Sequence, residues 1–387
     1  MNPLRLALIA VLVAAFALPA SARTWRIRVD GTGDAPTIAA AVAASSDGDS
    51  ILVGPGTYTW TNQNTIPGDW YAMLQLEPGQ ENLTLIGEAG PHATILDAQY
   101  QGRVLVTKGL NYLTMEGFTL RGGSAPALSV AIGGCMVLHV SHDVFRNCIF
   151  RDNSATTGGV AWVGGLAEPS FIDCEFAENT ATNGGALFLV NTSTPVIIER
   201  CRFHHNSATS DGGAISMVHI LARVEDSVFA FNQAPQGGAV YMRSMWAATF
   251  SRCTFVGNQG AEAGAFYVLA SPGIRIEQTI VSNGGEGTPY SVSLNSSVTF
   301  SCTDTYRNPV TNALPAHAID AGGNFSADPL YCGSTDSMNF TLAQASPCIP
   351  GNHPSGTACG QVGAFGVGCA PVTVRETTWG RIKAMYR

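Results

Sequence analysis

A repeat of about 26 residues in the middle of the chain limits the possible folds more than any other feature of the sequence. Each of five segments has a phenylalanine, an asparagine three residues later, and then a glycine pair, which is weakened to Ala-Gly in the last copy. Successive asparagines are separated by 26, 27, 26 and 26 residues. The apolar runs inside each copy are short and rich in Val, Ile and Phe, which is typical of strands. Because one such unit cannot bury its own apolar face, the copies must stack on one another, and the repeat predicts an all-β solenoid.

Stacking the copies at the inter-strand spacing of ~4.8 Å would place equivalent residues in columns along the solenoid. The phenylalanines would form an internal aromatic stack. The asparagines, whose amides carry both a donor and an acceptor, would hydrogen-bond from coil to coil. Four cysteines lie two residues before the phenylalanines, and we interpret them as buried apolar filler rather than as a metal or catalytic ladder. The columns are Phe150, Phe176, Phe203, Phe229 and Phe255; Asn153, Asn179, Asn206, Asn232 and Asn258; and Cys148, Cys174, Cys201 and Cys253.

The motifs Phe-x-x-Asn and Gly-Gly-Ala, recurring in register over about residues 148–285, resemble the repeats of the polymorphic outer-membrane proteins. Those proteins are adhesins with a right-handed parallel β-helix, within the wider pectin-lyase-like fold. The start of the chain is similar to that of many secreted proteins of this fold. It has a short predicted helix after Pro36 and a Pro-Gly-Thr-Tyr turn that ends at Tyr58. The resemblance implies an all-β fold, a right-handed parallel β-helix with an N-terminal helical cap.

The sequence divides into four regions. Residues 1–22 combine a positive start, a 13-residue apolar run and an Ala-Ser-Ala ending, which predict a signal peptide and therefore a secreted or cell-surface protein. Residues 23–300 form the predicted β-helix, with nine or ten coils in all and the regular ones at about 148–285. Residues 301–370 form a cysteine-rich segment that we expect to close the solenoid. Residues 371–387 form a basic, aromatic tail.

Ten cysteines in an exported chain permit disulfides. None is spaced as Cys-x-x-Cys, so a zinc knuckle or ribbon is not indicated. Half of them lie in the loop-rich C-terminal segment, where we expect at least one disulfide, with Cys348 and Cys359 as the proposed pair. Cys135 has no assigned partner. The candidate disulfide cysteines are Cys302, Cys332, Cys348, Cys359 and Cys369.

The charge of the chain excludes some classes of partner. It has 20 basic residues, of which only Lys108 and Lys383 are lysine, against 28 acidic ones, for a formal net charge of −8. Phosphate binding needs clustered basic side chains, so we expect no nucleic-acid partner. No later segment has 18 uninterrupted apolar residues, which argues against a transmembrane helix in the mature chain. We expect a polysaccharide, or a glycan or protein on a cell surface, as the partner; the oligomeric state is not predicted.

Two alternating columns follow the glycine pairs, and only one of them can face the core. The alternation determines that they lie on opposite faces but leaves open which one points inward. If the aliphatic column fills the core, four aromatic side chains line an outer face and suit the apolar faces of sugar rings. The aliphatic column is Ala161, Leu187, Ile215, Val240 and Phe266. The other is Trp162, Phe188, Ser216, Tyr241 and Tyr267, of which Trp162, Phe188, Tyr241 and Tyr267 are the candidate glycan-binding residues.

The signatures of β-helix enzymes are missing. There is no Asp-Asp pair, and neither Asn-Thr-Asp nor Gly-His-Gly, the motifs of polygalacturonases, is present. A sparse acidic stripe of Glu199, Glu225 and Glu277 is the one weak candidate for Ca²⁺, and no other cofactor is expected. The residues before the cysteine column alternate in charge from coil to coil, which we interpret as a solvated ion ladder rather than a catalytic row. They are Asp173, Arg200, Asp226 and Arg252.

These features favour a secreted or cell-surface protein that binds glycans or mediates adhesion and has no identifiable catalytic site. One alternative is a polysaccharide lyase or glycoside hydrolase of the pectin-lyase-like fold with an atypical site, which would need several carboxylates on one face. The other alternative is a passive structural protein of the cell surface, which would have no ligand.

Overall fold

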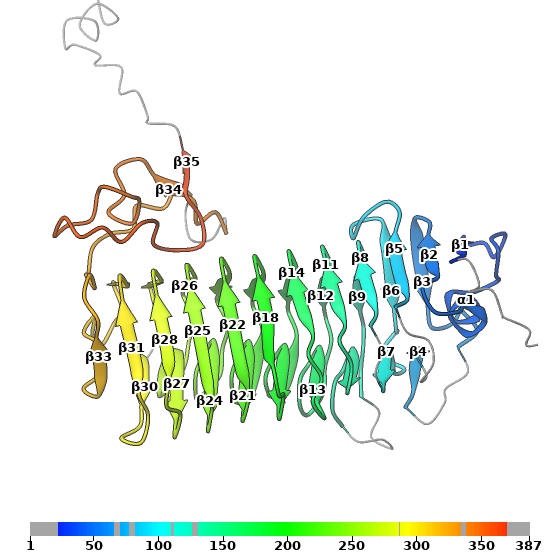
Figure 1. The fold of residues 1–387 in the computed structure, drawn as a ribbon, viewed down its shortest axis with the longest axis horizontal. Helices are drawn as coiled ribbons and strands as arrows, with labels where there is room; N and C mark the ends of the chain where they lie inside the picture. The colour runs from blue at the N-terminus through cyan, green and yellow to red at the C-terminus, as the bar shows by residue number, and fades with distance from the viewer. Residues whose placement is uncertain are drawn as a thin grey trace, which may run out of the picture.

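The computed structural model describes residues 22–65, 70–76, 82–109, 112–125, 131–285, 287–333 and 338–369. The expected tail and all but the last residue of the expected signal peptide lie outside these ranges. The described chain coils into an elongated solenoid, in which strands from successive coils pair in parallel and form three long sheets (Figure 1). This is the all-β solenoid that the repeat predicts.

A complete coil passes through one strand of each sheet in the order A, B, C, as in β14, β15 and β17. Sheet A consists of β1 (Thr24–Ile27), β2 (Ser50–Val53), β5 (Thr84–Gly87), β8 (Thr114–Glu116), β11 (Val144–Arg146), β14 (Ser170–Ile172), β18 (Pro195–Glu199), β22 (Leu221–Glu225), β25 (Ala247–Ser251), β28 (Ile274–Glu277), β31 (Val298–Ser301) and β33 (Ala318–Asp320). Sheet B consists of β3 (Gly56–Thr59), β6 (Thr94–Asp97), β9 (Thr119–Arg121), β12 (Ile149–Arg151), β15 (Glu175–Ala177), β19 (Arg202–His204), β23 (Val228–Ala230), β26 (Thr254–Val256), β29 (Ile280–Ser282) and β32 (Asp304–Tyr306). Sheet C consists of β4 (Ala72–Leu76), β7 (Arg103–Lys108), β10 (Met136–His139), β13 (Ala161–Gly164), β17 (Leu187–Val190), β21 (Ile215–Val218), β24 (Val240–Arg243), β27 (Ala263–Leu269) and β30 (Thr288–Val292).

The solenoid has more coils than the nine or ten expected, since sheet A alone contains 12 strands in the described residues. The first coils lack the repeat motif that marks the later ones, so their number is difficult to predict from the sequence. Two short pairs of strands lie outside the three long sheets. They are β16 (Thr180–Asn183) with β20 (Ser207–Asp211), and β34 (Leu342–Ala343) with β35 (Val367–Cys369).

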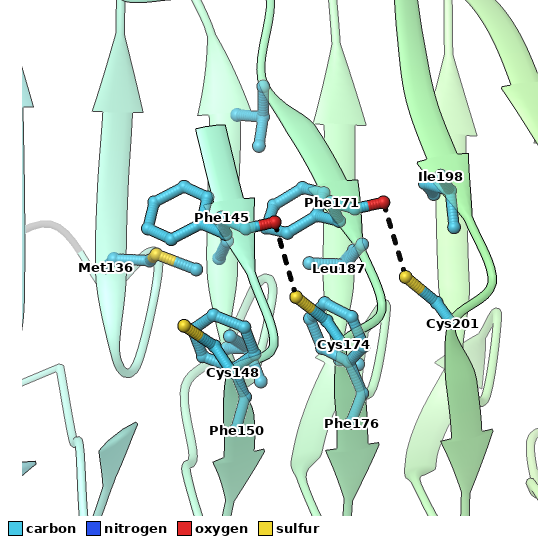
Figure 2. Packing of buried hydrophobic residues seen from close by; sticks show 14 of the residues in the cluster. Met136, Phe145, Cys148, Phe150, Phe171, Cys174, Phe176, Leu187, Ile198 and Cys201 are labelled. Carbon is cyan, nitrogen blue, oxygen red and sulfur yellow. Dashed lines mark hydrogen bonds between the residues drawn. The ribbon is translucent and has the colours of Figure 1, made fainter. Parts of the chain in front are cut away.

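The repeated phenylalanines form one continuous stack inside the solenoid. From Phe150 to Phe255, successive ring centroids lie 4.9, 4.4, 4.8 and 4.6 Å apart, and the planes of neighbouring rings differ by at most 17°. Phe145 and Phe171 from sheet A stack beside them at 5.2 Å (Figure 2). The spacing of the rings follows the spacing of the strands, so each coil adds one ring to a shared core.

The repeated asparagines are buried at the corner between sheets B and C and bond to one another. The amide of Asn206 donates to Oδ1 of Asn232 at 3.0 Å and to the carbonyl of Phe176 at 2.8 Å. Its own Oδ1 accepts from the backbone N–H and the side-chain amide of Asn179, at 3.1 and 2.9 Å. The same pattern runs from Asn153 to Asn258. The ladder therefore satisfies backbone groups that the corner would otherwise bury without a partner.

The repeated cysteines are free thiols in the core. The thiols of Cys174 and Cys201 donate to the carbonyls of Phe145 and Phe171, at 3.5 and 3.3 Å (Figure 2). Burial raises the pKa of the Cys253 thiol to about 12. A buried thiol with a raised pKa is a poor nucleophile and a poor metal ligand, which agrees with a packing role.

The proposed disulfide between Cys348 and Cys359 is wrong. Cys302 bonds to Cys359 and Cys332 bonds to Cys369, each pair with Cα atoms 5.5 Å apart. Cys348 is a buried free thiol, and its Sγ lies 3.4 Å from Oδ2 of Asp304. The pairing depends on which cysteines the folded chain brings close together. Closeness in the sequence does not reveal this.

Thiol titration checks this assignment directly. We expect a thiol reagent to label none of the cysteines in the native protein and six after unfolding without reductant, because six are free and all six are buried. Unfolding with reductant should release all ten. Rapid labelling of the native protein, or four thiols after unfolding, would contradict the cysteine assignment.

A short helix covers the N-terminal end of the core. Helix α1 (Ile38–Ala44) begins at Thr37, whose side chain accepts a hydrogen bond from the N–H of Ala40 at 3.0 Å. Ile38 and Val42 are buried against the first coils. Because the strand edge and core of a solenoid are exposed at its ends, such a cap shields them from water. Across the described ranges, no helix combines the length and apolar composition needed to cross a membrane.

The C-terminal segment, which we expected to close the solenoid, lies for the most part along its side. Strand β33 extends sheet A, after which the chain turns back, and β34 and β35 lie beside the solenoid (Figure 1). Phe340 packs on Val228 and Val256, which face outward from sheet B. Ile280 is buried under the same segment. The outer face of sheet B is thus apolar where the segment covers it, which explains why these outward positions carry Val and Ile.

Candidate functional site

The structure decides which of the two columns in sheet C faces the core. The side chains of the aliphatic column are fully buried, from Ala161 to Phe266. The column that begins at Trp162 points outward, and its members pair coil by coil in the register of sheet C. We call this outer column the aromatic row; it contains Trp162, Phe188, Ser216, Tyr241 and Tyr267.

One end of the aromatic row is a platform built around Trp162. The six-membered ring of Trp162 occupies the space above Gly164, where an added Cβ would lie 2.3 Å from the ring. The ring of His139 lies in the same way above Gly165 and stacks with Trp162 at 6.2 Å and 11°. Glycine at these two positions therefore gives the two rings room on the outer surface of the sheet.

The other end of the aromatic row, at Tyr241 and Tyr267, is less exposed than the sequence analysis expected. Tyr241 and Tyr267 stack on each other, with centroids 5.4 Å apart and planes 10° apart. Tyr241 is only 5% exposed, whereas Trp162, Phe188 and Tyr267 are half-buried. Because Tyr241 is almost fully buried, Trp162 offers the better surface for a ring-shaped ligand.

A second row of polar side chains runs beside the aromatic row. Its members precede the glycine pairs, where the chain enters sheet C, and they follow one another from coil to coil. The amide of Gln236 donates to Oε1 of Glu262 at 2.8 Å. We call this the edge row; it contains Asn183, Asp211, Gln236 and Glu262. Our sequence analysis missed it, although a polar residue before every glycine pair was the available signal.

Asp211 is the most perturbed member of the edge row. Its Oδ1 is buried and has no hydrogen-bond partner among the described residues, and the same is true of Oγ of Ser216. Burial raises the pKa of Asp211, although Asn183, Ser216 and the charge of Arg243 favour its charged form. Ser216 lies beside the carboxyl and favours its charged form, and both oxygens are shielded from solvent in this structure.

Comparison with known proteins identifies the architecture. Residues 106–281 match the family profile described as the right-handed beta helix region. This chain is a right-handed parallel β-helix protein. The narrower resemblance to polymorphic outer-membrane repeats stays a prediction.

Several solved structures are similar to this β-helix protein at low sequence identity. A pectate lyase, Pel9A, is 15% identical with a TM-score of 0.57, over 89% of this chain and 96% of that one. Carrot pectin methylesterase is 13% identical with a TM-score of 0.37, over 87% and 93%. The A-module of an Azotobacter vinelandii mannuronan C-5 epimerase, AlgE6, is 14% identical with a TM-score of 0.39, over 73% and 91%. A search of curated proteins found no match. At such identities the likeness to the pectate lyase shows a shared fold and says nothing of activity.

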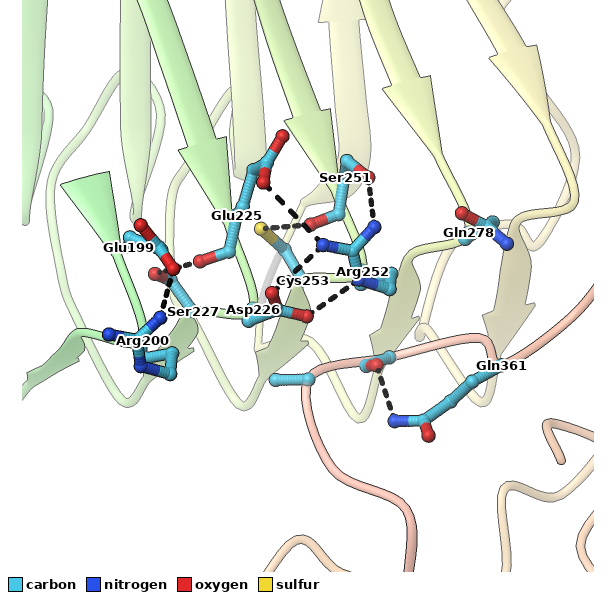
Figure 3. Close-up of polar contacts among 12 residues, drawn as sticks. Glu199, Arg200, Glu225, Asp226, Ser227, Ser251, Arg252, Cys253, Gln278 and Gln361 are labelled. Carbon is cyan, nitrogen blue, oxygen red and sulfur yellow. Dashed lines mark hydrogen bonds and ion pairs between the residues drawn. The ribbon is translucent and has the colours of Figure 1, made fainter. Parts of the chain in front are cut away.

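The acidic stripe considered for calcium lies at the ends of strands β18, β22 and β28 of sheet A in this β-helix protein. Figure 3 shows two of its members, Glu199 and Glu225. Each of its carboxylates is held by arginine: Glu199 by Arg200, Glu225 by Arg223 at 2.6 Å and Arg252 at 3.5 Å, and Glu277 by Arg275 at 3.4 Å. A calcium ion would have to displace these arginines, so the stripe does not fit a calcium site. Among the described residues no cluster of three or more His, Cys, Asp or Glu side chains is placed to hold a metal.

The alternating charges beside the stripe form ion pairs between coils. Arg200 bonds to Asp173 at 2.7 Å and Arg252 bonds to Asp226 at 2.7 Å. These pairs are partly exposed to solvent, so each contributes at most about 1 kcal/mol. Their geometry is that of a solvated ladder, as the sequence analysis interpreted them.

Proposed function

We propose that this protein binds an extended glycan along the outer face of sheet C. The observation that carries the proposal is the pairing of the aromatic row with the edge row on one outer face, both repeating with the strands. Aromatic faces contact the apolar faces of sugar rings, and amides and carboxylates hydrogen-bond to sugar hydroxyls. Because both rows run along the solenoid axis, a polymer would lie along that axis and meet equivalent groups at successive coils.

Each end of the face would contribute differently to binding. The platform of Trp162 and His139 would support a sugar ring. Gln236 and Glu262 would contact hydroxyls at the other end of the face. The main apolar contact would then lie at β13 and the polar contacts just before β24 and β27.

Export to the cell surface or the medium is part of the same proposal. Two disulfides are present, and such bonds persist in oxidising compartments. Together with the expected signal peptide, they support a secreted or cell-surface protein whose glycan binding would serve adhesion. A passive structural protein would show no glycan affinity, so binding experiments separate the two functions.

Replacing Trp162 by alanine tests the proposal. We expect the affinity for the bound polysaccharide to fall about tenfold, since losing one stacking contact costs about 1–1.5 kcal/mol. Affinity electrophoresis against soluble polysaccharides measures the change. Trp246→Ala is the matched control, because Trp246 is 53% exposed and lies outside the aromatic row.

A second variant separates the platform from general surface effects. Gly164→Leu should also weaken binding, because the new side chain would occupy the space of the Trp162 ring. Equal loss in the Trp162 and Trp246 variants, or no affinity of the wild-type protein for any polysaccharide, would contradict the proposal.

A further inference from the structure

A groove follows the corner at which the chain passes from sheet B to sheet C. Segments 207–209, 233–235 and 259–261 of three successive coils line it, together with Gly285 of the next coil. Its volume of about 750 Å³ lies within the range of sites that hold small organic ligands. Because it crosses four coils at a spacing of ~4.8 Å, it extends about 14 Å along the solenoid axis. We call it the corner groove.

The corner groove offers hydrogen-bonding groups without charge. None of the side chains that line it is charged. The hydroxyls of Ser207 and Thr209 form no hydrogen bond with a described residue, and the same is true of the side-chain amides of Gln233 and Gln259. Hydroxyls and amides both donate and accept, so these four side chains match the hydroxyls of a neutral sugar.

The shape of the corner groove favours a ligand that is already tethered. The groove is open to solvent, since Gln233, Gln259 and Ala261 at its walls are exposed. An open groove would bind a free monosaccharide weakly, because the contacts must first offset the loss of translational and rotational freedom. A sugar attached to a bound polymer has lost most of that freedom, so it meets the groove at a high effective concentration. The groove therefore suits a side chain of a polymer better than a free small molecule.

The corner groove borders the face on which we place the glycan. Pro235 in its wall directly precedes Gln236 of the edge row. One coil later, Ala261 precedes Glu262 in the same way. Burial and then the neighbouring Glu262 raise the pKa of the Tyr267 phenol, so the edge row in turn borders the aromatic row. A branch that leaves a chain on the aromatic row has only the edge row to cross before it reaches the groove.

We propose that the glycan bound along sheet C is branched and that the corner groove binds its side chains. This inference rests on the proposed glycan binding. The main chain lies on the aromatic row, and a side chain passes over Gln236 or Glu262 into the groove. An acidic side chain is disfavoured, because Glu262 stands beside the groove and no cation lines it. The side chains that bind there are therefore neutral sugars.

Polymers with and without side chains test this inference. Three neutral pairs are galactomannan before and after α-galactosidase, arabinoxylan before and after arabinofuranosidase, and a β-1,3-glucan before and after removal of its β-1,6-linked branches. Glucuronoxylan supplies acidic side chains. Affinity electrophoresis of the full chain measures binding to each polymer. We expect the wild-type protein to bind the branched member of a pair at least about tenfold more tightly, since the second contact on one polymer is intramolecular.

Two variants locate the contact. Ala261→Trp places a large side chain in the groove at an exposed position, and Gln233→Ala/Gln259→Ala removes both amides. Each should bind the branched polymer no more tightly than the debranched one. Thr182→Trp is the matched control, because Thr182 is exposed at the equivalent place of an earlier turn, outside the groove. It should keep the tenfold preference, whereas Trp162→Ala should weaken binding to both polymers.

The other outcomes separate this inference from the proposed function. Equal affinity of the wild-type protein for both members of every pair that it binds overturns the branched ligand and leaves the binding function standing. A preference that survives in both groove variants, or a preference for glucuronoxylan over the neutral polymers, also overturns it. If the wild-type protein binds no polysaccharide, both proposals fall. A misfolded variant is recognised because it loses affinity for the debranched polymer as well.

Discussion

Replacing Asn206 by alanine is expected to lower the free energy of unfolding by about 3–6 kcal/mol. Asn206 is fully buried and takes part in four hydrogen bonds of the corner ladder. Its removal leaves the N–H and side-chain amide of Asn179 and the carbonyl of Phe176 without partners in a place that water does not reach. An unsatisfied buried group costs more than the bond itself contributed.

Chemical denaturation measures this change, with Asn295→Ala as the matched control. Asn295 is exposed and its side chain forms no hydrogen bond among the described residues, so its replacement should change stability by less than about 0.5 kcal/mol. Similar effects of the two variants would show that the ladder adds little to the stability of the solenoid.

The second large effect concerns pH and Asp304, in the last strand of sheet B. Asp304 is fully buried between the solenoid and the C-terminal segment, where its Oδ1 accepts from the N–H of Ala327 at 3.0 Å and its Oδ2 lies near the thiol of Cys348. Burial raises the pKa of Asp304 from 3.8 to about 7, despite these contacts. The folded protein therefore binds a proton that the unfolded chain releases at lower pH.

The sign of the pH dependence follows from that difference. Below pH 3.8 the group is protonated in both states and costs nothing, and stability falls as the pH rises from there through about 7. The loss is at most about 4 kcal/mol. Asp304→Asn removes the charge and keeps an oxygen for Ala327, so we expect it to be more stable than wild type at pH 8 and nearly equal at pH 4.

Thermal unfolding of both proteins between pH 4 and 8.5 checks this expectation. Asp143, also buried, has its pKa raised to about 6 and should leave a smaller slope in the variant. Parallel curves for the two proteins would show that Asp304 does not control the pH dependence. Proteolysis of the C-terminal segment at the two pH values would locate the effect, since the segment covers this aspartate.

The repeat was enough to predict the architecture and the interior columns. Identical residues at a constant period must superpose when the coils stack, so the positions of Phe203 in the aromatic stack and Asn206 in the ladder follow from spacing alone. The sequence also showed that Trp162, Phe188, Tyr241 and Tyr267 share one face. Alternation along a strand is a property of any extended chain and needs no tertiary information.

Only the tertiary structure determined which column of sheet C faces the core, which cysteines form disulfides and where the candidate site lies. Alternation cannot say which face is the core, because that depends on what the other two sheets enclose. Cys359 bonds to Cys302 because the C-terminal segment turns back along sheet B, a path that no local pattern encodes. Asp211 and Glu262 are 51 residues apart in the sequence and share one edge, with Gln236 between them, through the stacking of coils. The perturbation of Asp211 arises from burial, which is a property of the folded chain.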